Sequence, residues 1–366
     1  MKTRNVKTLL SVAIIFFIAW ALIACTKKHV TPPVVKTDLT ASITAANTLI
    51  ASTHEGVAAG NYIKGSQAPL ITVVAQAQAV ADNTAATQAD VTAAIANLAA
   101  AVATYQSNLV VEIDPTNLVG QWTFDEIATA SADAVVKDYS GGNHDGALKE
   151  GHVFWAGSGV PTLAPDRYGI AGRALHFDKG QNVEIPYNAA LNPGSISISL
   201  WEKQDVESTI YTQQYMVSLG RRLGYKLQLQ YAPIAYFTAH VARSPGDTTF
   251  YDKDQFDGTL TQGNWYHIVV TFGGGHEIFY VNGVLKYDWG ADPTQAVPGT
   301  IVSLVAKPIN LTFGQDLPTS KYSTDAASPY YVNSGGFFHG TLDEIRIYKS
   351  VLTQAQVTSI YNLEKP

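Results

Sequence analysis

Residues 340–353, with the sequence GTLDEIRIYKSVLT, constrain the fold more than any other part of the chain. Their alternation predicts a β-strand, because successive side chains of a strand point to opposite faces of a sheet. Leu342 and Arg346 would then lie on one face and Ile345 on the other. Residues 118–126, LVGQWTFDE, show the same two-residue period. Since antiparallel sandwiches often pair their first strand with their last, we predict that these two segments are neighbours.

Between these two segments, turns rich in Gly, Asn, Asp and Pro separate short stretches of apolar and β-branched residues. The pattern predicts an all-β domain over 118–366, built as a two-sheet antiparallel sandwich. A short amphipathic helix over 352–363, with Thr353 as its N-cap, is expected at the end of the chain. The predicted strands are 118–124, 173–178, 182–187, 195–203, 214–221, 225–231, 235–243, 265–272, 276–281, 301–303, 309–314 and 339–348.

Seven short motifs follow one another along this region. They are WTFDE (122–126), DYSGGNHDG (138–146), GRALHFD (172–178), ISISLW (196–201), NWYHIVVTF (264–272), IFYVNG (278–283) and LDEIRIY (342–348). Their order resembles the laminin-G-like domains of the concanavalin A-like lectin/glucanase superfamily. The resemblance implies a jelly-roll sandwich. It does not identify a ligand, because this fold hosts many functions.

The first 24 residues begin with basic side chains and continue as an uncharged, largely apolar run. This pattern is typical of a signal peptide over 1–24, and the run is slightly short for a membrane span. The next residue, Cys25, completes the sequence LIAC, which resembles the lipobox of bacterial lipoproteins. The resemblance implies lipidation of Cys25 and a membrane-anchored protein of the cell envelope, expected on either face of the bacterial outer membrane. An uncleaved anchor helix with an incidental cysteine is the alternative.

Two segments separate this signal from the predicted sandwich. Residues 25–36 contain two adjacent prolines, which favour an extended spacer. Residues 37–110 are rich in alanine, poor in charge, and have apolar residues at helical spacing, which predicts three helices. Ser66 and Thr87 stand where N-caps are expected. Residues 111–117 form the linker to the sandwich.

The layout of the predicted helices around Asn61 and Tyr62 resembles the small three-helix modules called FIVAR. These modules occur in exported bacterial proteins, often beside carbohydrate-active domains. A small, alanine-rich core of close-packed helices favours a rigid spacer, and direct ligand binding by the helices is the alternative.

A calcium site is the first candidate for chemistry. If the first and last strands pair, two carboxylates approach each other and repel unless a cation lies between them. Calcium takes six to eight oxygen ligands, including backbone carbonyls of turns. The resemblance implies a structural calcium held by the side chains of Asp125 and Asp343 and by backbone oxygens of Gly142, Asn143 and His144, with Asp138 as either a further ligand or a residue that orients the ligands. Alternatively, Asp138 forms an Asx-turn and the other two carboxylates accept backbone N–H groups.

A glycan-binding surface is the second candidate. Sugars stack on aromatic rings and form hydrogen bonds with amide and charged side chains. Alternation along 225–231 predicts a strand with one polar and one apolar face. The alternative for each single aromatic residue is that its side chain packs in the hydrophobic core and does not contact a ligand. The predicted ligand-binding residues are Trp201, Arg221, Lys226, Gln228, Gln230, Tyr236 and His240.

Composition and motifs exclude several other functions. The formal net charge of −6 argues against nucleic acid as a partner. Cys25 is the only cysteine, so neither a disulfide framework nor thiol catalysis is expected. Glucanases of the resembling superfamily place carboxylates along one strand in the pattern ExDxxE, but here the acidic run 202–207 has Gln204 at the central position. We therefore predict a non-catalytic, glycan-binding protein. A protein-binding adhesion module is the alternative, and a hydrolase or lyase is less favoured.

Overall fold

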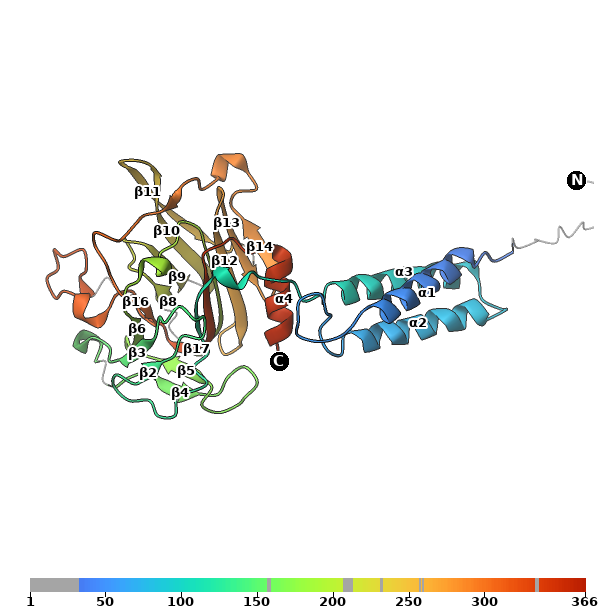
Figure 1. Ribbon diagram of the computed structural model, residues 1–366, viewed down its shortest axis with the longest axis horizontal. Helices are drawn as coiled ribbons and strands as arrows, with labels where there is room; N and C mark the ends of the chain where they lie inside the picture. Colours follow the sequence, from blue (N-terminus) through green and yellow to red (C-terminus); the bar gives the residue numbers. More distant parts are fainter. Residues whose placement is uncertain are drawn as a thin grey trace, which may run out of the picture.

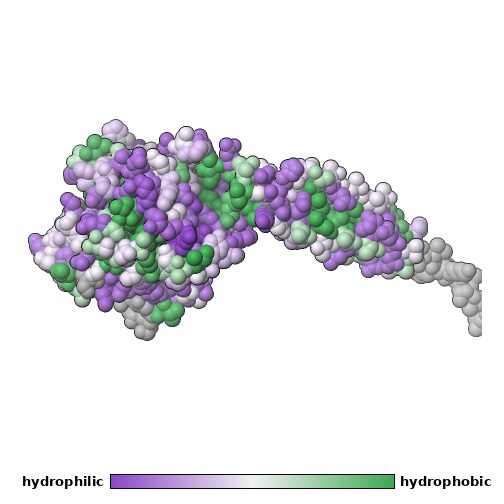
Figure 2. Space-filling model, turned by 60° about the horizontal axis from the view of Figure 1, so that its bottom comes forward, coloured by the Kyte–Doolittle hydropathy of each residue, from purple (hydrophilic) through white to green (hydrophobic). Residues whose placement is uncertain are grey.

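The computed structural model describes residues 33–156, 159–206, 213–230, 233–256, 258, 260–332 and 336–366. The predicted signal peptide, Cys25 and most of the 25–36 spacer lie outside the described residues. The described chain forms a narrow helical arm that extends from a rounded β-sandwich (Figures 1 and 2). Within the described residues, none of the helices is long and apolar enough to cross a membrane.

The arm consists of α1 (Thr37–Ser52), α2 (Gln67–Asp82) and α3 (Gln88–Gln106), which confirms the prediction of three helices. The helices run side by side, and α1 begins at the end of the arm that is far from the sandwich (Figure 1). Apolar side chains at helical spacing meet along the axis of the arm, where they exclude water. The fully or nearly fully buried ones include Leu39, Ile43, Leu70, Val91, Leu98 and Tyr105.

The two predicted N-caps of the arm have different outcomes. Thr87 caps α3 in a capping box with Asp90, as predicted. Ser66 stands at the N-cap position of α2 as predicted, but its backbone dihedral angles are helical and its side chain makes no cap hydrogen bond. The carboxylate of Glu55 instead accepts the N–H of Gln67 at 2.6 Å. Glu55 thereby satisfies one of the free N–H groups at the start of α2 from outside the helix.

The sandwich consists of two antiparallel sheets, as predicted. The first has the order β14-β13-β12-β7-β17-β5-β4, with β1 also paired to β17. Its strands are β14 (Val284–Asp288), β13 (His276–Val281), β12 (Tyr266–Gly273), β7 (Ile196–Gln204), β17 (Gly340–Tyr348), β5 (Ala174–Phe177), β4 (Thr162–Ala164) and β1 (Leu118–Trp122).

The second sheet has the order β11-β10-β9-β8-β16-β6-β3-β2, with β15 also paired to β10. Apolar side chains from the facing surfaces of the two sheets fill the space between them. The strands are β11 (Asp247–Asp254), β10 (Ile234–Ser244), β9 (Tyr225–Gln230), β8 (Gln214–Ser218), β16 (Leu311–Phe313), β6 (Asn182–Ile185), β3 (Gly146–Lys149), β2 (Val135–Val136) and β15 (Thr300–Ile301).

The predicted pairing of the first and last strands is confirmed, with Trp122 opposite Ile345 in the β1–β17 register. The predicted faces of β17 were partly wrong. The register between β17 and β7 shifts after Asp343, and Glu344 has a φ of 53°. This bulge lets Leu342 share the core with Ile345, although simple alternation places the two on opposite faces.

Helix α4 (Gln354–Glu364) packs on the outer face of the first sheet, and Thr353 caps it as predicted. Its buried side chains Val357 and Ile360 meet apolar residues of β12 and β13. The helix also contacts the linker, since Ser359 accepts the N–H of Val111 at 3.0 Å. Helix α4 therefore lies between the sandwich and the arm (Figure 1).

Several strands were not predicted, and β11 is the most consequential. Its sequence, DTTFYDKD, contains three aspartates, which are depleted in strands, and the segment is absent from the predicted strands. It forms the edge of the second sheet, where polar side chains on the solvent side are tolerated. Strands β2, β3, β4 and β14 were also missed, since each is short or lies at or near a sheet end.

Two glutamates face the interior of the sandwich. Glu202 lies on the same side of β7 as Leu200, and Glu277 on the same side of β13 as Phe279. Burial raises the pKa of Glu202 to about 8 and that of Glu277 well above its usual range. Burial therefore favours the protonated form of each carboxyl over the charged form.

The buried Glu202 predicts a specific pH dependence of stability. Between pH 4.5 and about 8 the folded state holds a proton that the unfolded state has released, so stability falls as pH rises. The slope contributed by this group is up to about 1.4 kcal/mol per pH unit. Glu202→Gln should remove that slope, so that the variant gains stability over the parent protein at pH 8 and loses the gain near pH 4.

Urea unfolding followed by tryptophan fluorescence measures this effect, because every tryptophan outside the predicted signal peptide lies in the sandwich region. Glu112→Gln is the matched control, since Glu112 is exposed. Equal pH slopes for the parent protein and Glu202→Gln would contradict the prediction.

Candidate functional site

The outer face of the second sheet carries polar side chains on adjacent strands, and we call it the polar face. On β9, Lys226 and Gln228 point outward because Leu227 and Leu229 occupy the core side. The register continues this face across the neighbouring strands, with Thr238 of β10 opposite Lys226. The residues on this face are Lys226, Gln228, Gln230, Tyr236, Thr238, His240, Phe250, Asp252 and Asp254.

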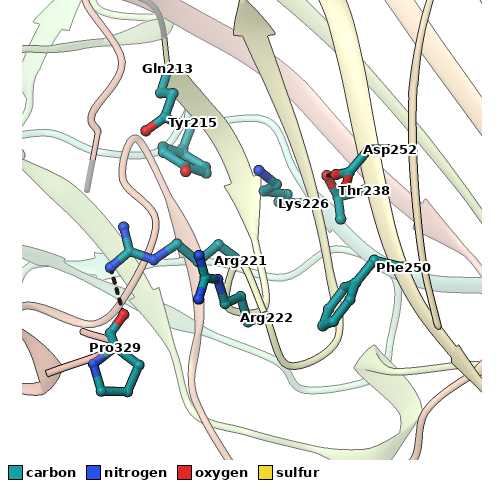
Figure 3. Close-up of a pocket in the computed structure, with 9 residues that line it drawn as sticks. All are labelled: Gln213, Tyr215, Arg221, Arg222, Lys226, Thr238, Phe250, Asp252 and Pro329. Carbon is teal, nitrogen blue, oxygen red and sulfur yellow. Dashed lines mark hydrogen bonds between the residues drawn. The ribbon is translucent and has the colours of Figure 1, made fainter. Parts of the chain in front are cut away.

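A cavity of about 520 Å³ opens on the polar face, within the usual size range of small-molecule sites. Figure 3 shows its lining side chains converging from the sheet and from loops that follow β8 and β16. The lining residues are Gln213, Tyr215, Arg221, Arg222, Lys226, Thr238, Phe250, Asp252 and Pro329.

Lys226 lies at the centre of this cavity and is only 9% exposed. Its ammonium donates to the amide oxygen of Gln228 at 3.0 Å and lies over the rings of Tyr215 and Tyr236, at 5.2 and 5.8 Å from their centroids. Gln228 in turn donates to Gln230 at 3.1 Å, which fixes the amides in a row. Burial lowers the pKa of Lys226, because the surroundings solvate its charge less well than water.

The wall beside Lys226 is built on an ion pair. The Nε of Arg221 lies 3.0 Å from the carboxylate of Asp316, which is fully buried behind the cavity. Asp316 also accepts the backbone N–H of Arg221, and the guanidinium donates to the carbonyl of Pro329 at 3.1 Å (Figure 3). These bonds hold the 220–224 turn against the loop that contains Pro329. Arg222, the next residue, is exposed at the mouth.

The opposite wall comes from β10 and β11. Thr238 donates its hydroxyl to the carboxylate of Asp252, its register partner. Phe250 stacks on His240 with 4.2 Å between ring centroids. His240 is bound through Nδ1 to the carbonyl of Leu223 at 3.0 Å. This wall presents a carboxylate, a hydroxyl and an aromatic ring to the cavity.

The structure brings together six of the seven predicted ligand-binding residues. Arg221 and Lys226 line the cavity, and Gln228, Gln230, Tyr236 and His240 lie on the same face.

Trp201 does not belong to this group, and its assignment as a ligand-binding residue was wrong. It lies on the outer side of β7 in the other sheet, beneath α4, where its indole N–H donates to Glu364 at 2.9 Å. Its ring stacks near Tyr361. The tryptophan therefore anchors the C-terminal helix.

Several lining residues are absent from the predicted ligand-binding set, namely Gln213, Tyr215, Arg222, Thr238, Phe250, Asp252 and Pro329. One signal for two of them was present, because Phe250 and Asp252 alternate with Tyr251 and Lys253 along β11. The loop residues have no such signal. Their position depends on contacts between segments far apart in the chain, such as Arg221 with Pro329.

The predicted calcium ligands do not share a site in the described structure. Asp343 pairs with Arg167 at 2.6 Å, and Asp125 pairs with Arg173 at 3.0 Å. Each carboxylate thus has its own guanidinium in the position where a shared cation was expected. Among the described residues, no group of three or more His, Cys, Asp or Glu side chains is placed to hold a metal ion.

The loop predicted to supply the other calcium ligands is closed by its own hydrogen bonds. Asp138 accepts the N–H groups of Gln121, Ser140 and His144 at 2.8–2.9 Å, so the alternative of an Asx-turn describes it. The carbonyl of His144 accepts the indole N–H of Trp122. Gly142 and Asn143 complete the turn, where Asn143 has a φ of 57°. This arrangement does not fit the ligand set of a calcium ion.

The geometry defines an all-β sandwich with a polar face that surrounds a cavity. Residues 177–302, which span β6 to β15, match the family model described as "Concanavalin A-like lectin/glucanases superfamily". This region therefore has the concanavalin A-like fold. A search of curated proteins gives no match.

Solved structures with a similar fold include domain 4 of AbnA, a GH43 extracellular arabinanase from Geobacillus stearothermophilus, in complex with arabinotriose. It has 18% identity and a TM-score of 0.45, over 67% of this chain and 98% of that domain. The binding domain of Paraclostridial Mosquitocidal Protein 1 has 14% identity and a TM-score of 0.45. The binding domain of botulinum neurotoxin DC, in complex with SialylT, has 13% identity and a TM-score of 0.43. This chain covers 52% and 51% of those two toxin domains, and each match covers 68% of this chain.

The arginine partners of the two aspartates predict that calcium does not stabilise the protein. Dialysis against a chelator, followed by addition of calcium, should move the thermal unfolding midpoint by less than about 2 °C. Arg167→Met, by contrast, should cost about 3–5 kcal/mol, because it leaves Asp343 buried without its partner. Differential scanning calorimetry measures both effects. A rise of more than about 5 °C on addition of calcium would overturn the prediction.

Proposed function

We propose that this protein is a lipid-anchored protein of the bacterial cell envelope whose sandwich binds carbohydrate without cleaving it. The observation that carries the proposal is the polar face with its cavity. It combines aromatic rings, amides, a hydroxyl and charged groups within one concave site. Sugars need this mixture, since their C–H faces stack on rings and their hydroxyls require donors and acceptors.

The layout of the domain supports ligand binding on this face. Helix α4 covers part of the outer side of the first sheet, whereas the outer side of the second sheet bears the cavity. The amides of Gln228 and Gln230 are already oriented by each other and by Lys226. Pre-oriented groups lose little conformational freedom when a ligand binds, which favours affinity.

The chemistry of the cavity also supports binding without cleavage. Glycoside hydrolysis commonly uses two carboxyl groups roughly 5–10 Å apart, one of them as an acid. Asp252 is the one carboxylate among the described residues that line the cavity, and it is bonded to Thr238. Glu202, from the acidic run of the sequence, lies in the core instead. A protein-binding adhesion module remains the alternative function.

A glycan array probed with the full-length protein in mild detergent tests the proposal. We expect binding to a defined saccharide, and we expect Tyr236→Ala to weaken it about three- to tenfold through loss of an aromatic contact. Tyr139→Ala is the matched control, because Tyr139 is exposed in the 138–146 loop and outside the polar face. Loss of binding in both variants, or in neither, would contradict the assignment of the site. A blank array from folded protein would favour the adhesion module.

The proposed membrane attachment has a separate test. Cys25→Ser removes the sulfur that would carry the lipid, so the variant should lose the mass of the acyl groups and keep its signal segment. Mass spectrometry of the membrane fraction from a bacterial host measures this directly. An unmodified Cys25 in the membrane-bound parent protein would support the alternative of an uncleaved anchor helix.

A further inference from the structure

We propose that the cavity on the polar face recognises an acidic sugar residue, whose carboxylate or sulfate group lies between Lys226 and Arg222. This inference rests on the proposed function and names its ligand class.

The charge of Lys226 is buried without a direct anionic partner. An ammonium has three N–H donors, and the described residues give this one a single acceptor, the neutral amide of Gln228. The rings of Tyr215 and Tyr236 add attraction for a cation but no negative charge. Buried charges are normally paired, so this ammonium has unused donors in a site that a ligand can enter.

The two carboxylates near Lys226, those of Asp316 and Asp252, form hydrogen bonds or ion pairs with other residues. Asp316 pairs with Arg221 and accepts its backbone N–H. Asp252 accepts the hydroxyl of Thr238. Neither carboxylate forms a salt bridge with Lys226 in the described structure. The charges of Asp316 and Asp252 favour the charged form of Lys226, but among the described residues no carboxylate forms an ion pair with its ammonium.

A second cation lies at the mouth of the cavity. Arg222 is exposed and makes no hydrogen bond or ion pair with a residue that the structure describes. In Figure 3 the ammonium of Lys226 lies between the two arginines on one side of the cavity and Asp252 and Phe250 on the other. A guanidinium binds carboxylate or sulfate oxygens through paired N–H donors, and a lysine binds them as a point charge.

The remaining wall suits the rest of the sugar. Phe250 offers a ring for a C–H face, and Asp252 and Gln228 accept and donate hydrogen bonds to hydroxyls. The cations therefore select the acidic group, while these residues bind the neutral part. The local positive charge contrasts with the net charge of −6 for the whole chain, so general electrostatic attraction of anions does not account for such a preference.

The test uses full-length protein in mild detergent and matched oligosaccharides. Oligogalacturonate is compared with its methyl ester, which has the same backbone without charge, and a sulfated oligosaccharide is compared with its desulfated form. By isothermal titration calorimetry, we expect at least one acidic ligand to bind on the order of tenfold to a hundredfold more tightly than its neutral counterpart.

Variants connect the preference to the two cations. Lys226→Met and Arg222→Ala should each reduce the acid-over-neutral preference, and Lys64→Met, on the exposed surface of the arm, should leave it unchanged. Arg222 is exposed, so its variant tests the proposal even if Lys226→Met fails to fold. Raising the salt from about 50 to about 500 mM should weaken acidic ligands alone.

The outcomes separate this inference from the proposed function. Equal binding of acidic and neutral forms, or a preference that both variants retain, would overturn the acidic ligand while leaving carbohydrate binding intact. Absence of binding to every form, together with a blank glycan array, would overturn both. Binding of either acidic class, dependent on Arg222, would support the inference.

Discussion

The sandwich depends on one strand, β17, which pairs with β1, β5 and β7 in the middle of the first sheet. The sheet is therefore incomplete until residues near the C-terminus are in place. The bulge at Glu344 turns Arg346 to the outer side, where it forms ion pairs with Glu344 and with Glu364 of α4. These side chains are only partly exposed, so removing one member of the group leaves a poorly solvated, unpaired charge and destabilises the fold. Strand order and helix docking are thus stabilised together.

The docking of α4 also determines which outer face of the sandwich is open to a ligand. A two-sheet sandwich has two outer faces, and α4 covers part of the first with Val357 and Ile360. The same helix contacts the linker and the end of α3 through Ser359 and Asn362. The arm is therefore attached on the covered side (Figure 1), and the polar face belongs to the other sheet. If Cys25 is lipidated as proposed, the helical arm lies between the membrane and the binding face.

The sequence predicted correctly those features that depend only on the alternation of side chains along a strand and on the place of the strand in the chain. Alternation along β9 correctly predicted that Lys226 and Leu227 lie on opposite faces of the sheet. The first and last strands of the sandwich also paired as predicted. Prediction from the sequence failed where an outcome depends on distant segments. Trp201 was assigned to a strand correctly, but only the docking of α4 shows which side of that strand is covered. Asp343 was expected to bind calcium, yet its partner is Arg167, 176 residues away in sequence.

The buried titratable side chains of the sandwich differ in whether a ligand can reach them. Glu277 is fully buried, and a carboxyl in that position avoids the penalty of burial by keeping its proton. Lys226 is nearly as buried but opens onto a cavity, with two tyrosine rings and an amide arranged around its ammonium. A methionine would fill the same space without the cost of desolvating a charge. Packing alone therefore does not explain a lysine here, whereas an anionic group entering from the cavity does.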